Sequence, residues 1–154
     1  MRMIWLAFPL LLVIAVDGIF TLRGQPAAYR KGTFTAVNEA CPIGRKALAE
    51  GPRTFTIALA CWAAAALVLA KILPGLLGQT FYGSVLLGHV WGSVSWVPGE
   101  ARSALKAFGS SYAQAPDLGY VSSTAYLVLV CLVTVFCLRR EDGVLLGLGT
   151  GNME

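Results

Sequence analysis

Three ionisable side chains stand where a membrane protein could use them for chemistry: Asp17, Glu39 and His89. Asp17 and His89 lie inside long apolar runs, where an ionisable group is costly and normally faces a protein partner. A carboxylate beside a histidine can exchange protons, and either group can hold a metal ion or a cofactor. These three residues are therefore the candidates for catalysis, and His89 is also the candidate ligand of a cofactor such as a haem or a chlorophyll.

Two of these residues also have purely structural interpretations. Arg53 begins the second apolar run at the membrane end where the first run stops, so it could form an ion pair with Asp17. His89 could be a neutral histidine that bonds to a serine or threonine of the next helix. The helical rise places Asp17 about 8 Å and His89 about 12 Å from the same end, so these two could also meet.

Small residues recur beside His89. Ser84, Gly88 and Gly92 are four residues apart, which puts them on one face of a helix. Small residues at this spacing allow two helix backbones to approach closely in a membrane. We therefore predict helix packing along this face, with a ligand groove as the alternative.

The elements that must position these residues are apolar helices. The chain has 154 residues, of which 56% are hydrophobic and 13% are charged, whereas soluble domains contain about 25% charged residues. This composition excludes an ordinary cytosolic enzyme. Four apolar runs are long enough to cross a hydrocarbon core of about 30 Å. We expect these spans at residues 4–22, 54–73, 76–97 and 121–138. The predicted fold class is all-α, a four-helix transmembrane bundle that forms a single domain over residues 1–154.

The connections between the spans differ in length. Residues 23–53 form a basic loop, in which Pro42 predicts a short helix through Glu50. A Pro-Gly pair at 74–75 predicts a tight hairpin between the second and third spans. Residues 98–120 form an interfacial loop, and residues 139–154 form a tail. The first run could instead be a signal peptide, but we expect a retained helix.

The positions of the basic residues and of the cysteines argue against nucleic-acid binding and against a metal site. The net charge is +4, but the basic residues stand at the ends of apolar runs, where they meet lipid headgroups rather than nucleic acid. Three of the four cysteines lie within apolar runs and none forms a CxxC pair, which favours packing roles and predicts no metal site. Phosphate-loop, HExxH, GxSxG and CxxCH motifs are absent from the sequence.

One resemblance covers roughly the first 50 residues. Asp17 is followed by Thr21 and then by the segment Asn38-Glu39-Ala40-Cys41-Pro42. This order resembles small uncharacterised prokaryotic proteins with about four membrane spans, in which an Asp and a Thr precede a Glu-x-Asn-Pro turn. Cys41 stands where that pattern has Asn, a better helix cap than Cys. The resemblance implies the architecture and singles out Asp17, Thr21 and Glu39, but it implies no activity.

Two functions follow as expectations. The first is a non-catalytic integral membrane subunit that packs into and stabilises a larger membrane protein complex. The alternative is a small membrane enzyme, or an ion or proton conductor, that uses an intramembrane site of Asp17, Glu39 and His89. The expected partners are the lipid bilayer and other membrane subunits, without nucleic acid, and the expected location is a prokaryotic inner membrane. The sequence names no cofactor.

Overall fold

The structure is a computed structural model that describes the backbone of residues 3–147 and the side chains of residues 7–137. Within these residues every regular element is helical, which confirms the all-α prediction. The elements are, in order, α1 (Met3–Arg23), α2 (Ala27–Arg30), α3 (Pro42–Ala49), α4 (Pro52–Ile72), α5 (Gly75–Val94), α6 (Val97–Ala107), the short 3-10 helix η1 (Ser111–Gln114) and α7 (Leu118–Gly147).

Two of these helices meet the requirements for crossing a membrane. Among the described residues, α4 and the Leu118–Cys137 part of α7 are long and apolar enough to span a bilayer. Most of their residues are not buried inside the chain, and this exposure suits helices that contact lipid. These two helices support membrane association.

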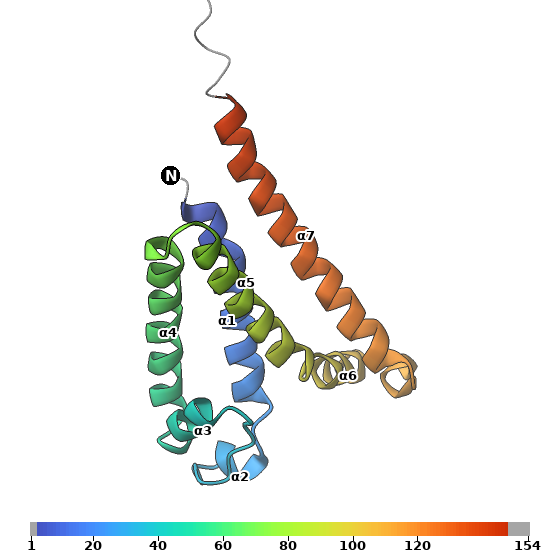
Figure 1. The fold of residues 1–154 in the computed structure, drawn as a ribbon. Helices are drawn as coiled ribbons and strands as arrows, with labels where there is room; N and C mark the ends of the chain where they lie inside the picture. Colours follow the sequence, from blue (N-terminus) through green and yellow to red (C-terminus); the bar gives the residue numbers. More distant parts are fainter. Residues whose placement is uncertain (1–2, 148–154) are drawn as a thin grey trace, which may run out of the picture.

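Three long helices, α1, α4 and α5, pack against one another (Figure 1). Helices α4 and α5 form the predicted hairpin, because Pro74 stops the first helix and α5 begins at the next residue. Helix α7 leans away from this trio in Figure 1 and contacts it mainly through α1, while α6 packs against α7. The site must therefore be sought within the trio.

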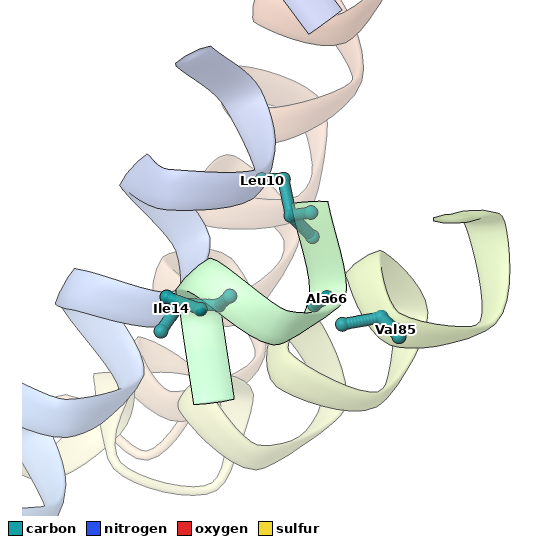
Figure 2. Close-up of a cluster of buried hydrophobic side chains, with 5 residues drawn as sticks. Leu10, Ile14, Ala66 and Val85 are labelled. Atoms are coloured by element: carbon teal, nitrogen blue, oxygen red, sulfur yellow. The ribbon is translucent and has the colours of Figure 1, made fainter. Parts of the chain in front are cut away.

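The apolar core of the trio lies toward the end of the bundle that holds the α4–α5 hairpin. Leu10 and Ile14 of α1 meet Ala66 of α4 and Val85 of α5, and each of the four side chains is buried (Figure 2). The small Ala66 side chain is fully buried, so it lets the neighbouring helices come close to the α4 backbone. This cluster fixes the relative positions of the three helices.

The loops hold more helix than the sequence predicts. The short helix from Pro42 is confirmed as α3, whereas α2 was not anticipated. The interfacial loop over residues 98–120 contains α6 and η1. The last helix was predicted to end at residue 138 and to be followed by a tail, but α7 continues to Gly147. The Arg and Glu residues at this point favour a helix and do not stop one. The rest of the predicted tail lies outside the described residues.

Candidate functional site

The centre of the candidate site is a contact between two helices. Asp17 projects from α1 and His89 from α5, and the Asp17 Oδ2 atom lies 2.7 Å from His89 Nδ1. Their side chains are 18% and 16% exposed, respectively, so the pair is largely shielded but still reachable. The structure thus brings together two of the three residues singled out for chemistry.

A tryptophan fixes the protonation state of the histidine. The indole Nε1–H of Trp62 in α4 donates to His89 Nε2 at 3.0 Å. Because an indole nitrogen only donates, Nε2 must be the unprotonated, accepting nitrogen. The ring proton is then on Nδ1, where it is donated to the Asp17 carboxylate. The geometry therefore describes a neutral histidine held in one tautomer between Asp17 and Trp62.

The close approach of α1 and α5 depends on one glycine. A Cβ atom at Gly92 would lie 2.7 Å from Asp17 Oδ1, which is too close for any side chain. Gly92 therefore fits the predicted packing role. Gly88 does not, because a Cβ there would meet nothing within 4 Å, and Ser84 is exposed. Gly88 and Ser84 line a cavity instead. Of the three small residues, only Gly92 packs against another helix of this chain.

The loop carrying Glu39 is held in place by a glutamine. Gln25 is buried just after α1, and its amide both donates to the Asn38 carbonyl oxygen at 3.1 Å and accepts from the Asn38 backbone N–H at 2.9 Å. The same amide donates to the Thr21 carbonyl oxygen at 2.8 Å. This clamp ties Asn38, the neighbour of Glu39, to the end of α1.

Glu39 also organises the start of α3. Cys41 is the N-cap residue and its side chain makes no capping bond, in agreement with the poor capping ability of cysteine. Glu39 satisfies a different free group, the backbone N–H of the N-cap residue itself, because its Oε1 accepts from the Cys41 N–H at 2.8 Å. Arg45 Nε donates to the Glu39 carbonyl oxygen at 2.8 Å. The acidic side chain thus has a structural role beside any chemical one.

These residues surround an open cavity between the three helices and the 38–41 loop. Its volume is about 870 Å³, within the range for small-molecule sites. A second hollow of about 370 Å³ adjoins it on the α3 side. Six residues line both spaces: Asp17, Thr21, Glu39, Cys41, Trp62 and His89. All three chemical candidates and Thr21 therefore border the same space.

Two structural interpretations of the sequence need correction. Asp17 is hydrogen-bonded to His89, whereas Arg53 is exposed in the first turn of α4. The loop end of the bundle is open to solvent, so Arg53 needs no buried partner. The ring of His89 bonds to Asp17 and Trp62 rather than to a serine or threonine. Ser93 Oγ donates instead to the His89 backbone carbonyl oxygen at 2.6 Å.

Helix α7 covers the back of this region. The Tyr126 hydroxyl is buried and faces Ser93, one turn from His89. Neither Tyr126 nor Trp62 nor Gln25 was singled out from the sequence. Trp62 lies one residue before a run of four alanines, and its role depends on a pairing of α4 with α5 that no local pattern encodes.

Metal binding by the three candidates together finds no support in the described part of the chain. No three His, Cys, Asp or Glu side chains there come close enough to hold one ion. No model of a protein family, no characterised protein and no solved structure matches this chain. The chemistry of the site therefore has to be argued from its geometry.

Proposed function

We propose that this chain is a four-span integral membrane protein that binds a small molecule in its interhelical cavity and uses Asp17 and His89 as an acid–base pair. The observation that carries this proposal is the 2.7 Å contact between Asp17 and His89 at the wall of an 870 Å³ cavity. This is the enzyme form of the alternative that the sequence suggested. The bilayer would be a prokaryotic inner membrane.

The lengths of α1 and α5 support the four-span arrangement. These helices have 21 and 20 residues, which gives each of them about 30 Å of rise, the thickness of a hydrocarbon core. Both run beside α4, which is apolar enough to span. A helix packed lengthwise against a spanning helix would share its depth in the bilayer.

The chemistry of the pair suits proton transfer. A carboxylate that accepts from Nδ1–H fixes the tautomer of a histidine and stabilises the imidazolium formed when Nε2 takes up a proton. In the observed state Nε2 accepts from Trp62. A bound molecule that displaced the indole would gain direct access to this basic nitrogen.

An apolar core separates the Asp17–His89 pair from the hairpin end of the bundle, which favours binding or catalysis over conduction. The core of Leu10, Ile14, Ala66 and Val85 fills the interface of the trio one to two helical turns beyond the Asp17–His89 pair. No chain of polar side chains continues through these four residues.

A second candidate function is the non-catalytic subunit of a larger membrane complex. It is favoured by the face of α5 that lines neither space, where Gly83 is open and Leu87 is 67% exposed. An apolar face with a glycine at its centre suits a helix of another membrane protein. Purification in mild detergent would test this candidate, since it requires larger partners in fixed stoichiometry.

Nuclear magnetic resonance of the imidazole nitrogens tests the acid–base proposal. His89 is the single histidine of the chain, so its ring signals need no assignment. With ¹⁵N-histidine in detergent micelles at neutral pH, we expect a neutral ring protonated at Nδ1 and a clear change in Asp17→Asn. Asp117→Asn, which alters an exposed aspartate outside the cavity, is the control. A ring protonated at Nε2, or identical signals in wild type and Asp17→Asn, would contradict the proposal.

Cysteine labelling tests the four-span arrangement. In a background without native cysteines, Thr33→Cys lies in the loop after α1 and Lys71→Cys in the last turn of α4, both at exposed positions. Oriented vesicles should give opposite accessibility to a membrane-impermeant reagent. Labelling from the same side would contradict the proposed crossing by α4.

A further inference from the structure

The charge at the cavity wall differs in sign from the charge of the whole chain. The sequence has 12 basic and 8 acidic residues. Nevertheless, neither the larger nor the adjoining space is lined by any lysine or arginine, while Asp17 and Glu39 line both. The cavity is therefore an acidic region in a basic protein.

Two arginines near this region line neither space and make other contacts. Arg45 Nε donates to the backbone carbonyl oxygen of Glu39, and Arg23 forms an ion pair of 2.9 Å with Glu100. His89 contributes no positive charge while its Nε2 accepts from Trp62. The negative charges of the Asp17 and Glu39 side chains thus face the cavity without a cation at its wall.

Aromatic rings form much of the remaining wall. Three of the four tryptophans in the chain line the larger space: Trp62, Trp91 and Trp96. Trp62 is 41% exposed and Trp91 is 79% exposed, so their ring faces are accessible. The face of an indole attracts a cation, and it does so most effectively for organic cations that are weakly hydrated.

We propose that the cavity binds an organic cation carrying an amine or quaternary ammonium group. The charged group would lie between the Trp faces and the carboxylates of Asp17 and Glu39. Aromatic walls suit such a group better than a metal ion, which needs several oxygen, nitrogen or sulfur ligands. This inference depends on the proposed binding function and specifies its ligand class.

A pair of isosteric probes tests the charge requirement. Choline and 3,3-dimethyl-1-butanol have nearly the same shape, but only choline is charged. Titration calorimetry of the full chain in maltoside micelles should detect choline and give a much weaker signal for the neutral alcohol. Inorganic phosphate, an anion, should not bind. Equal binding of both isosteres, preference for phosphate, or no binding of choline would overturn the inference.

Variants locate the binding to this cavity. Trp91→Leu and Glu39→Gln should each weaken choline binding roughly threefold to thirtyfold, the effect of losing a cation–π contact or a facing charge. Phe108→Leu and Glu50→Gln remove an aromatic and an acidic side chain at exposed positions that do not line the cavity. They should bind as wild type does. Equal losses in the control variants would place binding elsewhere and overturn the inference.

The ammonium group could belong to a free amine or to a lipid headgroup. Nanodiscs of phosphatidylglycerol, with and without phosphatidylcholine, separate these sources, because a headgroup ligand would compete with added choline and raise its apparent Kd.

The histidine spectrum distinguishes failure of the ligand class from failure of the acid–base pair. A neutral, Asp17-dependent ring without choline binding would overturn only the ligand class, whereas loss of that ring state would overturn the acid–base pair.

Discussion

The interface of α1, α4 and α5 has two unlike halves. Toward the α4–α5 hairpin, Leu10, Ile14, Ala66 and Val85 fill the space between the helices. Toward the loops, the same three helices leave a cavity, and most of the side chains at its wall are polar or aromatic. One set of helices therefore provides both a packed anchor and an open site.

The two halves are stabilised by different interactions. The packed half depends on close contact between apolar side chains, which is lost whenever an atom is removed. In the open half, Asp17, His89 and Trp62 form a hydrogen-bonded chain across three helices. Directional bonds of this kind can hold helices apart around a space that packing alone would close. The comparison therefore predicts large effects in the first half and smaller, more specific effects in the second.

The largest effect is expected from Leu10→Ala. Leu10 is fully buried in the packed half, and loss of a buried leucine typically costs about 2–5 kcal/mol because the cavity refills only partly. The free energy of unfolding, measured by SDS titration in mixed micelles, should fall by this amount. Leu87→Ala, at a position that is 67% exposed, is the control. Similar losses in the two variants would show that the packed half does not anchor the bundle.

The next effect is expected from Asp17→Asn. The substitution removes the charge that accepts from His89 Nδ1–H, and a hydrogen bond to a charged group contributes roughly 1–3 kcal/mol. The fold should persist while the histidine spectrum changes. Adding Arg53→Gln should rescue nothing, because Arg53 is not the partner of Asp17. Recovery of stability in the double variant would restore the ion pair expected from the sequence.

Two glycines of α5 provide a sharper comparison within the open half. Gly92→Ala would press a methyl group against the Asp17 carboxylate, and overpacking of this kind costs about 1–3 kcal/mol. Gly88→Ala meets no atom of the chain, so it should be neutral or stabilise the helix by up to about 1 kcal/mol. Thermal unfolding should therefore shift in opposite directions. Equal destabilisation by the two variants would contradict this contrast between a packed and an open glycine.

The long elements could be predicted from the sequence because their signals are local. Apolar runs and Pro-Gly pairs predict where α4 ends and α5 begins, and Pro42 predicts the start of α3. Helix rise predicted that Asp17 and His89 could meet, because both lie at similar depths, but the sequence offered Arg53 as an equally accessible partner of Asp17. Local patterns also misled: Ser84, Gly88 and Gly92 share a spacing, but only Gly92 faces another helix of the chain.

The rest of the site depends on contacts between distant parts of the chain. Gln25 has no distinctive neighbours in the sequence, yet it bonds to a residue 13 positions away. Trp62 bonds to His89 across 27 residues. The predicted pairing of Asp17 with Arg53 is wrong for the same reason. Arg53 lies at the expected end of the bundle, but the lateral arrangement of α1 and α4 does not make it the partner of Asp17. Depth can be predicted from periodicity, but lateral pairing of helices cannot.

The smallest effect concerns Tyr29, which stabilises the loops below the open half. Its buried hydroxyl donates to the Leu48 carbonyl oxygen at 3.0 Å, and burial raises the pKa of Tyr29 above the ordinary value of 10.0. Tyr29→Phe should therefore lower the free energy of unfolding by only about 0.5–1.5 kcal/mol at neutral pH.

The pH dependence gives this small effect a distinctive sign. The unfolded chain ionises Tyr29 near pH 10, whereas the folded chain retains the proton to higher pH, so the folded state binds more protons in this window. The stabilisation by Tyr29 is thus complete below about pH 10 and is lost as the pH rises through the raised pKa. The stability difference between wild type and Tyr29→Phe should shrink from pH 9 to pH 11. Tyr112→Phe, at a side chain that is 73% exposed, should show no such trend. A difference that stayed constant over this range would mean that folding does not raise the pKa of Tyr29, and therefore that the hydroxyl is not shielded by the loops.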